Sequence, residues 1–239
     1  MINFSNIKIV LLETSHPGNI GSVARAMKTM QFSKLHVVNP LCEINDISSA
    51  MASNAKDILE SATVSNNLDS VLEDCTFVIG TTARQRDIPI EIINPRELAC
   101  NIKKHQYEKI AILFGNESRG LTNKQLSNCN IGCHIPSNKA YTSLNIASSL
   151  QIILYEILME SNKDISNINK ADKKNLANHG KLTAFLDHAD KVLKDINFIK
   201  DDRPMISRKI QHIFKKADLT EEEINILRGI LTAIENHSQ

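Results

Sequence analysis

The feature that most constrains the fold of this chain is the alternation of short apolar runs and helical patterns over its first 160 residues. Apolar runs of strand length occur at residues 7–12, 35–38, 76–79 and 110–114. Between them, apolar residues recur at helical spacing at 19–31, 46–59 and 95–104. Short strands separated by helices predict an α/β fold with a mostly parallel sheet and helices on both of its faces.

The rest of the chain divides into an apolar helix, a polar stretch and a helical unit. Residues 146–159 are apolar on nearly every side, so we expect this helix to be buried by its own sheet or by a second subunit. A polar linker follows, and beyond it apolar residues recur at helical spacing. The last helix opens with Thr220 and Glu223, which form a capping box. We expect a domain at 1–160, a linker at 161–178 and a helical extension at 179–239.

Composition narrows the possible functions. The formal net charge is only +1, so the chain lacks the general basic coating of many nucleic-acid-binding domains. It has no Trp, and 4% aromatic residues leave few stacking surfaces for single strands. The sequence contains neither a membrane-spanning stretch nor a signal peptide, and its five cysteines lack zinc or disulfide spacing. We therefore expect a cytoplasmic protein that uses no membrane and no metal.

Four polar loops follow strands, at 14–19, 80–86, 115–120 and 136–143, and the first three contain glycine. Each has an ordinary interpretation: Asn19 caps one helix with Arg25 at its edge, and Ser143 caps another with Asn145 in its first turn. None is a P-loop or a dinucleotide-binding glycine motif. However, open α/β sheets bind ligands at the carboxyl ends of their strands, so the shared location of the loops indicates a site.

The positive charge of the chain is local. Residues 171–218 contain 11 Lys or Arg and 7 Asp or Glu. Around residues 203–216, helical spacing places apolar residues on one face of a helix: Ile206, Ile210, Ile213, Phe214 and Ala217. It places polar and basic ones on the opposite face: Arg208, Lys209, His212, Lys215 and Lys216. Such a face is either plain solvated surface or a surface that contacts phosphates, and we favour the second.

Three ordered motifs carry a resemblance to a known family. They are His16-Pro-Gly-Asn-Ile-Gly-Ser-Val-Ala-Arg-Ala-Met27, Phe114-Gly-Asn-Glu-Ser-Arg-Gly-Leu-Thr122, and Ile135-Pro followed by Tyr141-Thr-Ser-Leu-Asn-Ile-Ala147. The set resembles the motifs of SPOUT-class RNA ribose 2′-O-methyltransferases. It is most similar to the TrmJ family, bacterial tRNA (cytidine/uridine-2′-O-)-methyltransferases that act at nucleotide 32 of the anticodon loop. The segment Asn225-Ile-Leu-Arg-Gly-Ile-Leu231 also resembles the terminal helix of that family.

The resemblance implies a SPOUT-type sheet with a C-terminal trefoil knot around residues 115–120 and 135–150, a homodimer, and tRNA as the partner. It implies that S-adenosyl-L-methionine is held by Thr81, Thr82, Ala83, Gly115, Ile135, Thr142, Ser143 and Leu144. It implies that Arg25 is catalytic, together with Asn19, Glu117, Ser143 and Asn145. For RNA binding we add basic residues near these motifs and on the basic helix within 203–216: Arg25, Arg84, Arg208, Lys209, Lys215 and Lys216.

Two questions stay open on the sequence. In the family proposal Arg25 is the general base, but a guanidinium rarely gives up its proton, so Arg25 can instead clamp a phosphate and orient the hydroxyl. The methylated nucleotide can also be one at another position of tRNA, or one in ribosomal RNA, instead of nucleotide 32. A further alternative is a non-catalytic RNA-binding protein that has kept the fold.

Overall fold

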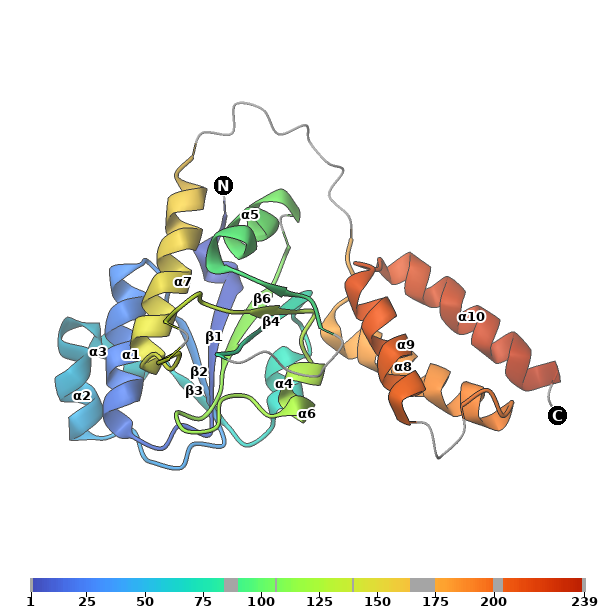
Figure 1. Cartoon of the computed structure of the whole chain (residues 1–239), viewed down its shortest axis with the longest axis horizontal. Helices are drawn as coiled ribbons and strands as arrows, with labels where there is room; N and C mark the ends of the chain where they lie inside the picture. Colours follow the sequence, from blue (N-terminus) through green and yellow to red (C-terminus); the bar gives the residue numbers. More distant parts are fainter. Residues whose placement is uncertain are drawn as a thin grey trace.

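A single seven-stranded sheet forms the centre of the larger part of the molecule (Figure 1). The computed structural model describes residues 2–83, 90–105, 107–138, 140–163, 175–199 and 204–237. The strand order is β3-β2-β1-β6-β4-β7-β5, and the neighbouring strands pair in parallel. The strands are β1 (Ile7–Leu12), β2 (Lys34–Val38), β3 (Thr63–Ser65), β4 (Phe77–Thr81), β5 (Ile92–Ile93), β6 (Ile110–Phe114) and β7 (Ile131–Cys133). The expected parallel α/β fold is confirmed.

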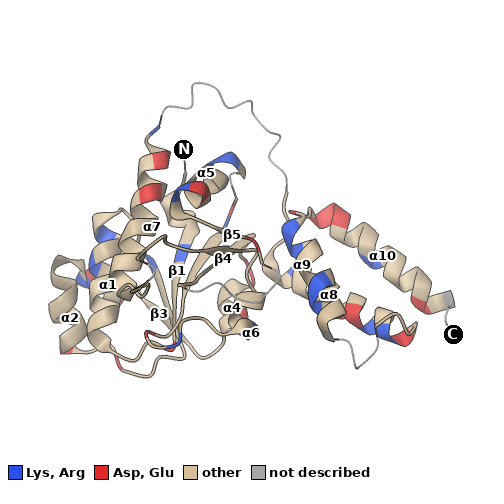
Figure 2. Ribbon diagram, in the orientation of Figure 1, with Lys and Arg blue, Asp and Glu red and all other residues tan. Residues whose placement is uncertain are grey.

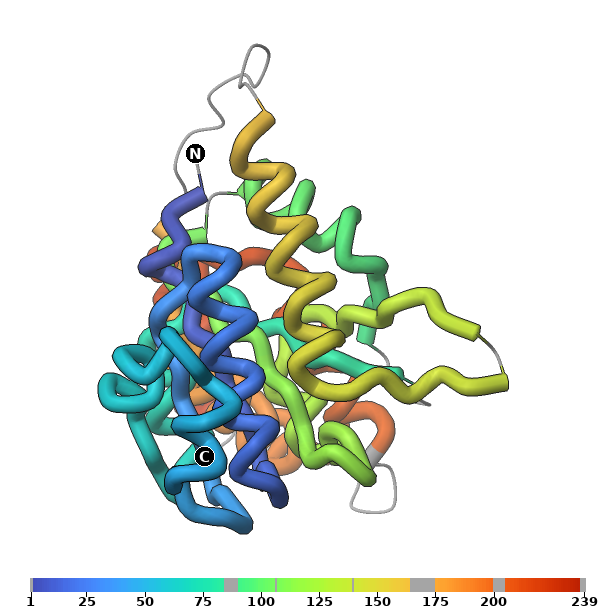
Figure 3. Tube along the Cα trace, turned by 90° about the vertical axis from the view of Figure 1, so that its left-hand side faces the viewer, coloured from blue at the N-terminus to red at the C-terminus, as the bar shows by residue number. Residues whose placement is uncertain are grey.

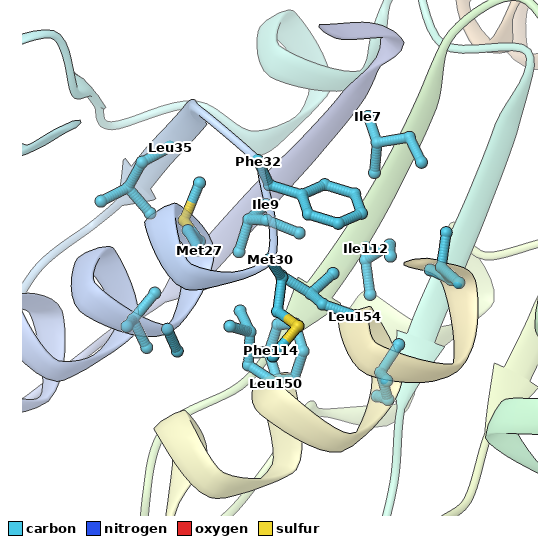
Figure 4. Packing of buried hydrophobic residues seen from close by; sticks show 14 of the residues in the cluster. Ile7, Ile9, Met27, Met30, Phe32, Leu35, Ile112, Phe114, Leu150 and Leu154 are labelled. Atoms are coloured by element: carbon cyan, nitrogen blue, oxygen red, sulfur yellow. The ribbon is translucent and has the colours of Figure 1, made fainter. Parts of the chain in front are cut away.

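Helices cover both faces of this sheet. The helices of the sheet domain are α1 (Pro17–Thr29), α2 (Asp46–Ala52), α3 (Lys56–Glu60), α4 (Leu68–Leu72), α5 (Pro95–His105), α6 (Asn123–Ser127) and α7 (Ile146–Ser161). Side chains of β1 alternate between two cores: Ile9 and Leu11 pack with α1, α5 and α7, whereas Val10 and Leu12 pack with α4 and α6. Figure 4 shows the first core, where Met27 and Leu150 approach the sheet from different helices.

The C-terminal helices have a core of their own. They are α8 (His179–Asp195), α9 (Pro204–Lys216) and α10 (Glu221–His237), and they lie beside the sheet domain (Figure 1). Phe185 and Phe214 meet edge to face with ring centroids 4.9 Å apart. The expected capping box opens α10: Thr220 Oγ1 accepts from the Glu223 amide at 3.2 Å, and the Glu223 carboxylate accepts from the Thr220 amide at 2.8 Å. The helical extension is therefore present, while its exact boundary with the linker stays a prediction.

Local structure departs from the sequence pattern in two ways. The helix expected at 46–59 is interrupted, because Ser53 has a φ of 53° and the chain forms a 3₁₀ turn (Ser53–Ala55) between α2 and α3. Several short elements are missed by the pattern, since two to five residues are too few to show a period: β3, β5, β7, α4 and α6. A second 3₁₀ turn (Phe4–Asn6) precedes β1.

Helix α7 is buried on one side only. Leu150, Ile153 and Ile157 lie fully in the first core, and Figure 3 shows α7 in gold between α1 and α5. Its outward face leaves apolar side chains in solvent, with Ile152 37%, Tyr155 48% and Met159 44% exposed. The sheet domain therefore covers only one side of this apolar helix. The trefoil knot stays a prediction.

Candidate active site

A cavity of about 440 Å³ lies at the carboxyl ends of β4, β6 and β7. Its walls come from the end of β4, the segment after β6 and the segment that leads into α7. All the residues predicted to hold the cofactor line it: Thr81, Thr82, Ala83, Gly115, Ile135, Thr142, Ser143 and Leu144. Asn19, Glu117 and Asn145 line it as well. The structure thus brings together residues that the chain separates by more than a hundred positions, and their roles stay predictions.

The loop after β6 owes its shape to close backbone packing. A Cβ atom added to Gly115 would lie 2.2 Å from both the Gly120 carbonyl carbon and the Leu121 nitrogen. Gly120 itself has a φ of 67°, and its amide donates to the Asn116 carbonyl at 2.7 Å. Two glycines are therefore required to fold residues 115–121 tightly against the cavity.

Three polar side chains from separate segments are linked within the cavity wall. The Asn19 Nδ2 group donates to Glu117 Oε1 at 2.8 Å. The Asn19 Oδ1 atom accepts from Asn145 Nδ2 at 3.2 Å. An ionised carboxylate only accepts hydrogen bonds, so Glu117 fixes which way the Asn19 amide points. Burial raises the pKa of Glu117, but the hydrogen bonds from Asn19 and Ser15 outweigh it and hold the pKa below its ordinary value.

Two expected helix caps are wrong. His16, not Asn19, caps α1: its Nδ1 accepts from the Gly18 amide at 3.1 Å, because Pro17 starts the helix two residues before Asn19. Asn145, not Ser143, caps α7, and its Oδ1 accepts from the Ala147 amide at 2.9 Å. The Asn19 side chain is thereby available to bind Glu117 in the cavity wall.

Sequence reasoning missed two residues that tie the first loop to the loop after β6. Glu13 has a φ of 54°, and its carboxylate binds Arg119 Nη2 at 2.8 Å and Gln125 Nε2 at 3.1 Å. Ser15 donates to Glu117 through both its amide and its hydroxyl. Both lie in or next to the loop at 14–19, but their partners are about a hundred residues away, so no sequence spacing indicates them.

Arg25 lies outside the cavity. It is exposed on α1, six residues past Asn19, which places it about 9 Å further along the helix and about 240° around it. Within the part of the chain that the structure describes, its guanidinium has no hydrogen-bond or ion-pair partner. The structure therefore groups Asn19, Glu117, Ser143 and Asn145 and leaves Arg25 apart from them.

The expected basic face of α9 is wrong in one member. Arg208, Lys209 and Lys216 are exposed, and Lys216 pairs with Glu91 at 2.8 Å. Lys215 is instead 8% exposed. Figure 2 shows the basic residues of α9 and the acidic start of α10. Arg84, the remaining residue predicted to bind RNA, lies outside the described residues.

Contacts with the sheet domain explain the burial of Lys215. Its ammonium donates to the Ser127 carbonyl, and its own carbonyl accepts from Asn130 Nδ2 at 3.0 Å. Burial lowers the pKa of Lys215. Because Lys215 turns inward, Ile213 turns outward and is 63% exposed, contrary to the expected apolar face. Lys215 therefore anchors α9 and does not belong to its solvent-facing surface.

The described residues contain neither a cluster of metal ligands nor a membrane-spanning helix. Among them, no group of three or more His, Cys, Asp or Glu side chains is arranged to hold a metal ion. None of the described helices is long and apolar enough to cross a membrane.

Comparisons with known proteins assign the chain to a family. Residues 6–155 match the SpoU rRNA methylase family, and residues 180–239 match the C-terminal domain of the tRNA methyltransferase TrmJ. The tRNA (cytidine/uridine-2′-O-)-methyltransferase TrmJ of Sodalis glossinidius is 42% identical, over 98% of this chain and 92% of that relative.

Solved structures agree over the full length. The crystal structure of TrmJ from Z. mobilis superposes with a TM-score of 0.83 at 27% identity, covering 95% of this chain and 98% of that one. A probable methylase family protein from Haemophilus influenzae gives a TM-score of 0.64 at 39% identity, with 98% of both chains covered. The chain therefore belongs to the SpoU methylase family of SPOUT-type methyltransferases, in its TrmJ branch.

Proposed function

We propose that this protein transfers a methyl group from S-adenosyl-L-methionine to the ribose 2′-OH of a cytidine or uridine at position 32 of the tRNA anticodon loop. One observation carries the proposal: a single cavity collects all the predicted cofactor residues together with Asn19, Glu117 and Asn145. The name of the TrmJ relative from Sodalis supports the same chemistry and substrate class.

The cavity suits the cofactor in size and lining. Its volume of about 440 Å³ lies within the range of about 300–1,000 Å³ that is usual for small-molecule sites. Phe114, Ile135 and Leu144 offer apolar surface for an adenosine, while Thr81, Thr142 and Ser143 offer polar groups. Bound there, S-adenosyl-L-methionine would supply an electrophilic methyl group on a sulfonium.

The side chains at the cavity would orient the ribose. Ser143 and Asn145 are exposed at its mouth, and Asn19 is held by Glu117. Such groups contribute mainly by fixing the hydroxyl in line with the methyl group, which removes much of the entropic barrier. Both oxygens of Glu117 already accept from protein donors, so we assign this residue to holding Asn19 and not to taking the proton.

Arg25 acts in this proposal across a homodimer. The exposed apolar face of α7, with Ile152, Tyr155 and Met159, lies on the helix that packs against α1, where Arg25 is exposed. A second copy that covered this face would bring its Arg25 toward the cavity of the first. There the guanidinium, which rarely gives up its proton, would clamp a phosphate of the RNA and orient the 2′-OH. When the hydroxyl oxygen takes the methyl group, the cofactor would leave as the neutral thioether S-adenosyl-L-homocysteine, and the hydroxyl proton would pass to solvent water at the exposed mouth of the cavity.

The C-terminal helices would hold the rest of the tRNA. Arg208, Lys209 and Lys216 give α9 an exposed basic surface, and Arg84 is proposed to add to it. In this division, residues 1–160 form the methyltransferase domain, residues 161–178 form the linker, and residues 179–239 form a helical extension that contacts the RNA. We place the reaction in the cytoplasm, where the tRNA substrate is found.

A methyl-transfer assay tests the proposal. Purified protein is incubated with labelled S-adenosyl-L-methionine and either unmodified tRNA or ribosomal RNA, and cofactor binding is measured by calorimetry. We expect cofactor binding and label in tRNA alone. Label in ribosomal RNA would favour that substrate, and absence of cofactor binding would favour a non-catalytic RNA-binding protein.

A further inference from the structure

The loop between β1 and α1 contributes a residue that none of the motif assignments covers. Ser15 is exposed, and it directs two donors at the same carboxylate. Its hydroxyl lies 2.8 Å from Glu117 Oε2, and its amide lies 3.1 Å from Oε2 and 3.3 Å from Oε1. Asn19 supplies the only other side-chain donor to Glu117 among the described residues. Ser15 thus supplies two donors to this carboxylate, its hydroxyl and its amide, beside the Asn19 side chain and the backbone amide of Glu117 itself.

The backbone that precedes Ser15 is itself fixed by contacts with other segments. The Glu13 amide donates to the Val38 carbonyl at 2.9 Å, and its carbonyl accepts from Asn116 Nδ2 at 2.8 Å. Thr14 is fully buried, and its carbonyl accepts from the Leu41 amide at 2.9 Å. The backbone from which Ser15 reaches Glu117 is therefore held in place before any ligand arrives.

We propose that Ser15 is a positioning residue of the methyl-transfer site, which fixes the carboxylate of Glu117 and, through it, the side-chain amides of Asn19 and Asn145. The chain of contacts runs from Ser15 to Glu117, then to Asn19 and then to Asn145, the cap of α7. It joins the start of α1, the loop after β6 and the start of α7. The assignment rests on the function proposed above.

Ser15 does not line the cavity, so its loss should alter turnover and not cofactor affinity. A hydrogen bond to a charged group is strong enough that its removal slows turnover about tenfold. We expect Ser15→Ala to lower kcat by about that factor, with the Kd for S-adenosyl-L-methionine within about twofold of wild type. Ser15→Thr keeps the hydroxyl and should restore kcat. Ser22→Ala is the matched control, because it also removes a serine hydroxyl, but one that donates to the Gly18 carbonyl within α1 and not to Glu117.

A double-mutant cycle shows whether Ser15 acts through Glu117. If it does, Ser15→Ala should cause no further loss of kcat in a Glu117→Gln background. A full additional tenfold loss in that background would overturn the proposal, as would a fall in cofactor affinity that parallels the fall in kcat.

A spectroscopic measurement decides the assignment without turnover. In ¹⁵N spectra of the protein without cofactor or RNA, the side-chain amide signals of Asn19 should shift in Ser15→Ala and stay in place in Ser22→Ala. Unshifted Asn19 signals in Ser15→Ala would overturn the proposal. A wild-type protein that transfers no methyl group would instead refute the proposed function, and the Asn19 signals would still report whether Ser15 holds the network.

Discussion

Gly115 offers the sharpest test of how the cavity is built. In Gly115→Ala, the new Cβ would start 2.2 Å from two backbone atoms of residues 120 and 121, whereas ordinary contact begins at 3.4 Å. The loop must therefore open by about 1.2 Å. The bond between the Gly120 amide and the Asn116 carbonyl, now 2.7 Å, would lengthen to about 3.9 Å and break.

The magnitude follows from these two effects. Overpacking of this kind costs about 1–3 kcal/mol, and the lost backbone hydrogen bond costs about 1 kcal/mol. We therefore expect Gly115→Ala to lower the free energy of unfolding by about 2–4 kcal/mol. Because residues 115–121 form one wall of the cavity, affinity for S-adenosyl-L-methionine should fall at least about tenfold.

Urea unfolding and calorimetry measure both quantities. The matched control is Gly229→Ala in α10, where an added Cβ meets nothing within 4 Å. There the same substitution should stabilise the helix by about 0.5–1 kcal/mol. The reasoning is refuted if Gly115→Ala unfolds at the wild-type urea concentration and binds the cofactor normally.

Three further predictions concern the catalytic arginine, the basic helix and a charge cluster. Arg25→Lys should lose methyl transfer while cofactor affinity stays within about twofold, because Arg25 lies outside the cavity; full turnover would count against both roles discussed for it. Changing Arg208, Lys209 and Lys216 together to Gln should weaken tRNA binding and reduce its salt dependence, and an unchanged affinity would exclude this surface. Burial raises the pKa of Asp74, but hydrogen bonds from Lys8 and Lys109 outweigh it and lower the pKa to about 2. Because the pKa is lower in the folded protein than in the unfolded chain, the ionised carboxylate stabilises the fold above the ordinary carboxyl pKa, and this stabilisation is lost as the pH falls. The difference in unfolding free energy between wild type and Asp74→Asn should therefore shrink from about pH 5 to about pH 2. A difference that stays constant over this pH range would contradict the prediction.

The sheet could be predicted from sequence because its central strands are buried on both faces. Such strands read as continuous apolar runs, and β1 and β6 have the predicted bounds. Strands of two or three residues, such as β5 and β7, carry no period and could not be found. The predicted Asn19 cap was wrong for a local reason, since Pro17 starts α1 two residues before Asn19.

The candidate site could be predicted only where motifs marked it. The motif residues converge on one cavity, but Ser15 and Glu13 find their partners 102 and 106 positions further along the chain. Such pairs become visible only when parallel strands bring their carboxyl ends together. For Lys215 the sequence pattern was misleading. Helical spacing placed its ammonium in solvent, whereas in the structure the ammonium is buried and donates a hydrogen bond to the Ser127 carbonyl.

Mass mapping of the methylated product tests the central claim most directly. Unmodified tRNA is treated with the protein and S-adenosyl-L-methionine, digested with a nuclease, and its fragments are sequenced by mass spectrometry. The account predicts one added methyl group on the ribose of the pyrimidine at position 32. A methyl group on a base, or tRNA that gains no methyl group at all, would contradict it.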